Sequence, residues 1–200
     1  MSKIFDQILF KVKAARSLTL SSAPDGFDAL IVADLARRFA QEGDDHSAAL
    51  VFVARDGQRQ AQMETALGFL APDLDVLSFP NWDCQPYDRV SPHTGIVARR
   101  MTVLSRLARS KTGEDRPRVL IVTANGLMQR VTARSKIASE SFSAAPGNRV
   151  DTKALALWLD SNGFIRTATV RETGEICSAW GNYRSLRPRY AFAGSVRFFW

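Results

Sequence analysis

Cysteine and histidine are scarce in this 200-residue sequence, which contains two of each. Cys84 and Cys177 lie far apart and form neither a CxxC motif nor a zinc-binding pattern. No apolar run approaches the roughly 20 residues of a membrane-spanning helix, and charges interrupt the apolar stretch at the N-terminus, unlike in a secretory signal. We therefore expect a reduced, cytoplasmic protein without a disulfide framework, a metal ion or a membrane anchor.

Acidic residues are missing only at one end of the chain. The net charge is +7, from 27 Lys and Arg against 20 Asp and Glu, yet residues 178–200 hold four arginines and no acidic residue. Aromatic residues are mixed with these arginines, as in proteins that bind single-stranded nucleic acid. The alternative, which we favour, is that this basic aromatic tail has no selected role.

The rest of the composition is typical of a globular protein, with 46% hydrophobic and 24% charged residues. Four apolar segments have the pattern of strands in a parallel sheet, and they are expected near 17–22, 48–54, 74–79 and 119–124. Helices are expected over 4–16 and 27–42, from Asp56 to just before Pro72, and over 95–109. This alternation predicts an α/β fold.

The predicted helix over 95–109 carries a possible inner stripe and a possible binding face. The stripe consists of Val97, Met101, Leu104 and Ala108. The arginines on the same helix are Arg99, Arg100, Arg106 and Arg109. They could contact phosphate or an acidic partner, but we favour a solvated helix face.

A small α+β unit is expected after the sheet, over residues 137–177. Its helix begins near Asp151, and residues 164–170 alternate like a half-buried strand. The chain has no internal repeats.

The loop after the first predicted strand, residues 21–29, is where many α/β proteins hold a nucleotide phosphate. Such a loop needs several glycines and a lysine. This one has only Gly26 and no lysine, and Asp25 and Asp28 would repel phosphate. We therefore predict no nucleotide cofactor and no catalytic residue here.

The loop over residues 80–93 is rich in proline and aromatic residues, and we expect Trp82 to pack against the sheet domain. Asp83, Asp88 and His93 could suggest a metal site, but their spacing matches no metal motif. The reading we favour is that Ser91 or Thr94 caps the following helix, with His93 beside it.

Two stretches carry longer and more specific sequence motifs than the loops described above. Residues 77–108 read LSFPNWDCQPYDRVSPHTGIVARRMTVLSRLA, and residues 119–131 read VLIVTANGLMQRV. The order F-P-x-W-D-x-x-P-Y-D-R-x-S-P-H, then a helix, then L-I-V-x-x-x-x-L-M-Q-R-V resembles the N-terminal module of bacterial transcription-repair coupling factors. Residues 149–175 are similar to that family's small inserted domain, so the resemblance covers about 1–176.

The resemblance implies a sheet domain over 1–136 like that of the damage-recognition protein UvrB, similar to a P-loop NTPase domain whose nucleotide loop has decayed. It implies that the α+β domain over 137–177 is of the kind that recruits UvrA. The family's polymerase-binding and DNA-translocating parts lie downstream in longer proteins, and we expect this chain to lack them. The implied protein is a non-catalytic module with UvrA as partner, no small-molecule substrate, and only indirect contact with DNA.

The resemblance stops at Cys177. Codons can be chosen for residues 177–200 that, read one nucleotide on, give A-A-R-G-G-I-I-D-L-Y-A-P-G-M-P-L-P-V-R-F-D-F-F-G, which follows the family pattern almost throughout. We therefore hypothesise a frameshift near Cys177, with residues 178–200 as an aberrant tail. The gene sequence tests this, because a single-nucleotide shift must restore that pattern.

The family's UvrA contact uses two arginines, and their places in this chain fall at Ala179 and Ser195. The nearest substitute is Arg197, with Phe198 or Phe199 in the role of the phenylalanine that follows the second arginine. We therefore predict impaired UvrA binding, with Arg197 and Phe199 as the candidate contact residues. The alternatives are an NTP-binding, helicase-like enzyme domain and a nucleic-acid-binding domain.

Overall fold

The computed structural model describes most of the chain: residues 2–15, 17–24, 26–42, 49–84, 89–108, 116–139, 142–144, 151–161, 164–171, 175–179, 182–185 and 196–198. The chain forms two compact units, each with segments from two parts of the sequence. Unit 1 is Met1–Phe79 with Ser110–Gln129, and unit 2 is Pro80–Arg109 with Arg130–Trp200. The predicted domain limits at residues 136 and 177 stay predictions.

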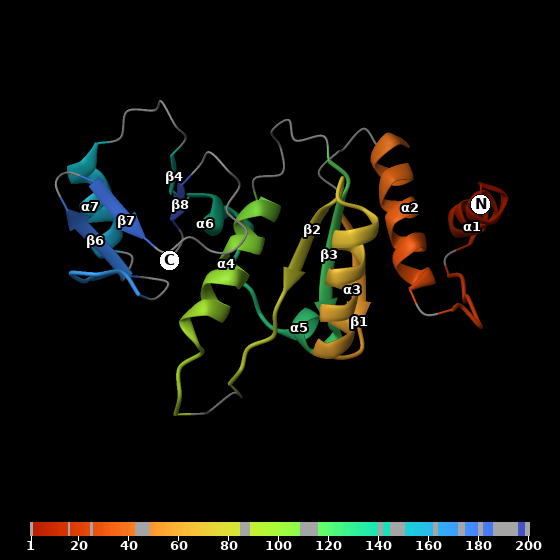
Figure 1. The fold of residues 1–200 in the computed structure, drawn as a ribbon, viewed down its shortest axis with the longest axis horizontal. Coiled ribbons are helices and arrows are strands. Elements are labelled where there is room, and N and C mark those ends of the chain that lie inside the picture. The colour runs from red at the N-terminus through yellow and green to blue at the C-terminus, as the bar shows by residue number, and fades with distance from the viewer. Residues whose placement is uncertain are drawn as a thin grey trace. The chain divides into compact units, whose positions relative to one another are not determined.

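Unit 1 contains a parallel sheet of three strands, which confirms the α/β class (Figure 1). The strands are β1 (Ala49–Ala54), β2 (Asp75–Phe79) and β3 (Arg118–Thr123), in the spatial order β1-β3-β2. Their bounds agree with three of the four predicted strands. In the central strand β3, Val119, Ile121 and Val122 are buried.

The fourth predicted strand, 17–22, is wrong. The segment has no regular structure, and Ser22 has a positive φ of 58°, which ends an extended conformation. Leu18 packs against a cluster formed by helices α1 (Ser2–Ala14) and α2 (Phe27–Glu42), while Leu20 is exposed. The short alternating pattern is typical of a strand, but its apolar residue Leu18 packs against helices instead.

Helices α2 and α3 (Gly57–Leu70) supply the core of unit 1. Alternate residues of the strands, such as Leu50, Phe52 and Ile121, join that core with Met63 and Leu67 of α3. The predicted cap of α3 is confirmed, because the Asp56 side chain accepts a hydrogen bond from the backbone N–H of Arg59 at 2.8 Å. A short helix, α5 (Ala124–Met128), follows β3 directly.

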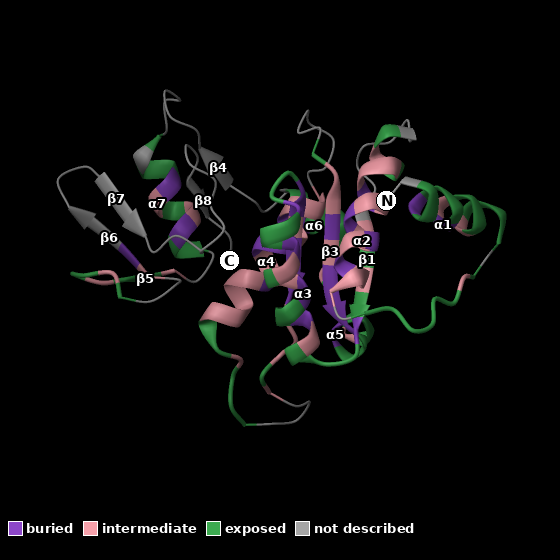
Figure 2. Ribbon diagram, turned by 45° about the vertical axis from the view of Figure 1, so that its right-hand side comes forward, coloured by how far each residue is buried: buried purple, intermediate pink, exposed green. Residues whose placement is uncertain are grey.

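Strand β1 is less buried than its apolar sequence predicts. Val51 and Val53 lie on the side of the strand away from the α2–α3 core, and each is 47% exposed (Figure 2). Their exposure follows from position, since β1 is an edge strand of the described sheet. Among the described residues, no helix has the length and apolar character needed to cross a membrane.

The described residues of unit 2 form helices α4 (Thr94–Ala108), α6 (Arg134–Ser139) and α7 (Thr152–Ser161) and five short strands. Strands β5 (Ile165–Arg166), β6 (Glu175–Ala179) and β7 (Asn182–Ser185) form one small sheet, and β4 (Phe142–Ala144) pairs with β8 (Val196–Phe198). The helix predicted near Asp151 is confirmed, and the strand predicted over 164–170 is reduced to β5. An α+β arrangement is therefore present at the end of the chain.

The α7 helix has a small core of its own. Leu155, Leu159 and Ile176 are buried, and Trp158 and Phe164 pack against them with ring centroids 6.1 Å apart. All of these residues precede Cys177, where the family resemblance ends.

The buried side of α4 differs from the predicted stripe. Its buried residues are Arg100, Thr102, Val103 and Ser105, whereas Val97, Met101, Leu104 and Ala108 are only half-buried. The helix is apolar on more than one side, so periodicity alone could not identify the buried side.

Candidate functional site

The glycine-poor loop before α2 is held by its own polar contacts. The backbone N–H of Phe27 donates to the Pro24 carbonyl at 3.0 Å, and Gly26 has a φ of +82°, which favours glycine. A Cβ at Gly26 would meet nothing within 4 Å. The glycine is therefore required by the turn and not by a close backbone contact. Asp25 lies outside the described residues.

Asp28 places a carboxylate in the first turn of α2, and Arg59 of α3 forms an ion pair with it. The second carboxylate oxygen of Asp28 accepts from the N–H of Ala29 at 3.0 Å. A helix N-terminus attracts anions through its free N–H groups and its dipole. In this chain an aspartate supplies that negative charge, and Arg59 neutralises it.

Sequence reasoning noted Asp28 but missed Arg59, because nothing local links two residues that are 31 positions apart. It also missed Gln60, a buried polar residue of α3. The Gln60 side-chain amide donates to Ser78 Oγ at 3.1 Å, to the Phe79 carbonyl at 2.9 Å and to the Ile121 carbonyl at 3.3 Å. Gln60 thus connects β2 and β3 at one point.

His93 itself occupies the capping position before α4, so the expectation that Ser91 or Thr94 caps this helix is wrong. Its Nδ1 accepts from the N–H of Gly95 at 3.1 Å, and its carbonyl accepts from Ile96 at 2.9 Å. The His93 backbone N–H donates to the Asp83 carboxylate at 3.2 Å. These two residues therefore have structural contacts, and Asp88 lies outside the described residues.

Arg100 is not part of a solvated helix face, and that expectation is wrong for this residue. It is 1% exposed, its guanidinium lies 4.0 Å from the ring centroid of Trp82, and it donates to the Pro80 carbonyl at 2.7 Å. Burial lowers the pKa of Arg100 to about 10. Trp82 is half-buried and supports a buried cation within unit 2.

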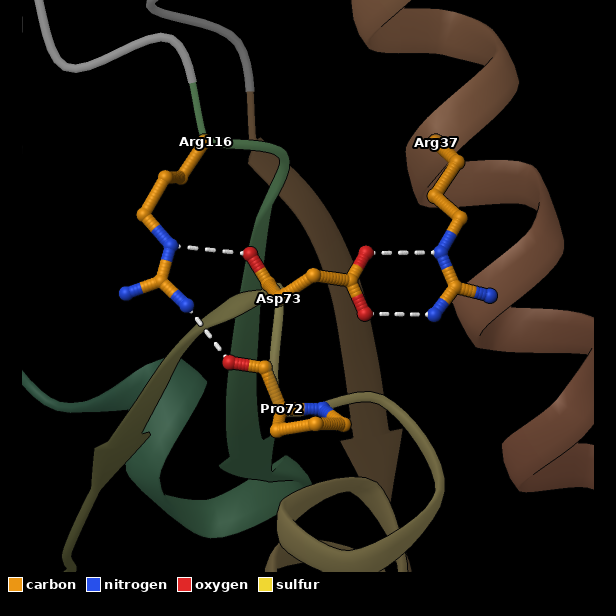
Figure 3. A network of polar contacts seen from close by, with 4 residues as sticks. All are labelled: Arg37, Pro72, Asp73 and Arg116. Atoms are coloured by element: carbon orange, nitrogen blue, oxygen red, sulfur yellow. Dashed lines mark hydrogen bonds and ion pairs between the residues drawn. The ribbon is translucent and has the colours of Figure 1, made fainter.

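A second arginine network joins elements of unit 1 around the turn before β2 (Figure 3). Arg37 of α2 makes two hydrogen bonds to the Asp73 carboxylate, at 2.8 and 2.6 Å. Arg116 donates to the Asp73 carbonyl at 2.9 Å and to the Pro72 carbonyl. The hydrogen bonds from Arg37 lower the pKa of Asp73 below its usual value.

The predicted UvrA contact falls on the last described strand. Arg197 lies in β8, and the antiparallel pairing places it opposite Ser143 of β4. Ala179, at the place of the family's first arginine, ends β6 opposite Asn182 of β7. Phe199 and Ser195 lie outside the described residues, so the proposed pair of Arg197 and Phe199 stays a prediction.

The chain is similar to three transcription-repair-coupling factors over most of its length. It is 30% identical to that of Escherichia coli K12 over 164 residues, which are 82% of this chain and 13% of the relative. It is 26% identical to that of Haemophilus influenzae, covering 78% and 12% of the two chains, and 26% identical to that of Rickettsia bellii, covering 62% and 11%.

No protein-family model matches the chain. The similarity confirms the resemblance carried by the motifs in residues 77–108 and 119–131, and the chain spans about an eighth of the length of the relatives it matches. This protein is therefore homologous to a segment of the transcription-repair-coupling factors.

Proposed function

We propose that this chain is a non-catalytic, protein-binding module of a transcription-repair-coupling factor, and that its partner is UvrA. The observation that supports a non-catalytic role best is the arrangement at the start of α2. Asp28 and Arg59 form an ion pair at the N-terminus of α2, and a helix N-terminus is a position that can bind a nucleotide phosphate. A phosphate there would have to displace a carboxylate of the same charge.

The role of a whole coupling factor is not transferred to this chain. The chain matches 13% of the Escherichia coli relative, and polymerase binding and DNA translocation are expected of other parts of such proteins. UvrA recruitment by the small domain is the function that the resemblance assigns to the segment present here.

We further propose that the aberrant sequence after Cys177 impairs UvrA binding. Arginine pairs with carboxylates through two parallel hydrogen bonds, and the family places two arginines in this region. This chain has Ala179 and Ser195 at those places, and Arg197 is the nearest substitute. Loss of one partner of a desolvated charge pair costs about 2–5 kcal/mol of binding, which is roughly a 30-fold to several thousand-fold loss of affinity.

The test is a calorimetric titration of UvrA with two forms of the chain. One is the chain as it stands, and the other carries the frame-shifted pattern in place of residues 177–200. We expect weak or no binding by the first and clear binding by the second. Micromolar or tighter binding by the first form that is lost on Arg197→Ala would show that the contact survives.

A nucleotide-binding assay distinguishes the enzyme alternative. We expect no ATP binding, with or without Mg²⁺, by the chain or by its Arg59→Ala variant. ATP binding at micromolar concentration that is weakened by Arg59→Ala would instead favour an NTP-binding domain. Circular dichroism of both proteins provides the control for folding.

A further inference from the structure

Acidic residues are absent from two segments of unit 2. Residues 89–109 and 130–139 together contain eight Lys and Arg and no Asp or Glu. Both segments belong to the same compact unit, and helices α4 and α6, which they contain, pack against each other (Figure 1). The fold therefore concentrates positive charge that is separated by more than twenty residues in the sequence.

We use the name α4–α6 basic cluster for five basic residues of these two segments, of which Arg134 and Lys136 lie on different sides of α6: Arg99, Arg106, Arg130, Arg134 and Lys136. Arg99 and Arg106 are seven residues apart on α4, which puts them on the same side of the helix and about 10 Å apart along its axis. Arg134 Nε donates to the carbonyl of Ala108, the last residue of α4, at 3.3 Å. This contact brings the start of α6 to the end of α4 that carries Arg106.

Most of the basic cluster is accessible. Arg130, Arg134 and Lys136 are exposed and Arg106 is half-buried, whereas Arg99 is half-buried with its Nε atom buried. The neighbouring Arg100 differs, because it is buried against Trp82. The arginines of this region thus divide between one that is buried and several that reach the surface.

We propose that the α4–α6 basic cluster binds the phosphate backbone of duplex nucleic acid. Positive side chains spread along a helix match a regular array of phosphates, and releasing the counterions of that array favours binding. Protein–protein interfaces instead centre on aromatic and apolar residues, and single-stranded nucleic acid binds to exposed aromatic rings. Trp82, Trp158 and Phe164, the aromatic side chains of unit 2 whose burial the structure describes, are half-buried.

The test is fluorescence anisotropy with a short DNA duplex of mixed sequence, measured with the full chain over a series of salt concentrations. The double variant Arg130→Glu/Lys136→Glu should weaken binding at least about tenfold and reduce the slope of log affinity against log salt by about 2. The matched control is Lys3→Glu/Lys11→Glu, which makes the same charge change at two exposed positions of α1 in unit 1. The control should weaken binding less than roughly threefold, since it alters only the net charge.

Equal losses in the two double variants would overturn the proposal, because binding would then follow net charge alone. No loss in the cluster variant together with loss in Arg184→Glu/Arg187→Glu would also overturn it and assign binding to the tail. Binding of single-stranded DNA or poly-glutamate as tight as that of the duplex would overturn the choice of partner. If Arg130→Glu/Lys136→Glu does not fold by circular dichroism, Arg130→Gln/Lys136→Gln should show the same reduction in slope.

This inference goes beyond the proposed UvrA role. A chain that binds UvrA in frame-restored form but binds no duplex would refute only the nucleic-acid proposal. A chain that binds duplex but does not bind UvrA in frame-restored form would refute only the UvrA proposal.

Discussion

Unit 1 and the α4–α6 region of unit 2 use arginine in different ways. In unit 1 several arginines pair with carboxylates: Arg37 with Asp73, Arg118 with Asp75 at 2.9 Å, and Arg59 with Asp28. In the α4–α6 region of unit 2, Arg100 contacts a carbonyl and an aromatic ring, and Arg134 contacts the carbonyl at the end of a helix.

The two regions differ in the chemical groups that contact each guanidinium. A paired carboxylate neutralises the charge and ties two elements together, as Arg37 ties α2 to the turn before β2. A carbonyl or a ring stabilises the group but leaves its formal charge in place. In unit 1, Arg37, Arg59 and Arg118 thus connect parts of the fold, whereas in unit 2 Arg130, Arg134 and Lys136 are exposed.

The largest loss of stability is expected from a substitution in the core around α3 in unit 1. Leu67 is fully buried, so Leu67→Ala should lower the free energy of unfolding by about 3 kcal/mol. Urea denaturation followed by circular dichroism measures this. The control is Phe69→Ala, two residues away and 85% exposed, with an expected change within about 0.5 kcal/mol.

Tryptophan fluorescence can follow the unfolding of unit 2 separately, because all four tryptophans lie in unit 2. The circular dichroism midpoint of Leu67→Ala reports both units, and the tryptophan midpoint reports unit 2. An unchanged circular dichroism midpoint would contradict the assignment of Leu67 to the core.

The buried cation of unit 2 should be the next most sensitive point. Trp82→Ala removes the ring beneath Arg100 and should cost about 2 kcal/mol, less than for a fully buried tryptophan, because Trp82 is half-buried. A double-mutant cycle with Arg100→Met should give a coupling energy of about 1 kcal/mol. A coupling energy near zero would mean that ring and cation do not interact.

The amide of Gln60 should matter to a similar or smaller extent in unit 1. Gln60→Leu leaves the Phe79 and Ile121 carbonyls without this donor and should cost about 1–2 kcal/mol. Thermal and urea unfolding measure the change. The exposed Gln62→Leu is the control, and equal effects from both variants would contradict a specific role for Gln60.

The smallest effect expected concerns the ion pair in Figure 3. Arg37→Gln should cost less than about 1 kcal/mol at neutral pH, because both side chains are partly exposed and screened by solvent. Arg37 lowers the pKa of Asp73, so this stability is present above the unfolded pKa of about 3.9 and is lost as the pH falls through the lower folded value.

The difference between the parent chain and Arg37→Gln should therefore shrink as the pH drops below about 4. The control is Arg55→Gln, whose arginine is 85% exposed and pairs with its neighbour Asp56. A difference that grows with acidification would contradict the assigned direction.

Prediction from sequence succeeded where a signal was local. The Asp56 cap, the helix over 27–42 and three strands of the sheet each depend on residues within a few positions, so their patterns were readable. It failed for 17–22, because a strand also needs a neighbouring strand, and Leu18 packs on helices instead.

The same limit applies to the sites. The scarcity of glycine and the lack of lysine in residues 21–29 were visible in the sequence, and so was the departure from the family pattern at Cys177. Arg59 could not be found, because its partner Asp28 is brought to it only by the packing of α2 near α3.

Thus the sequence by itself determined the class of fold, most helix positions, the three strands of the parallel sheet, the family and the charge of each segment, since these depend on composition and short-range pattern. Only the tertiary structure decided which of several chemically identical arginines is buried, paired or free to reach solvent. Arg99 and Arg100 are neighbours with the same side chain, yet one is half-buried and the other fully buried. Burial and pairing depend on residues that are distant in the chain, and folding alone brings those residues together.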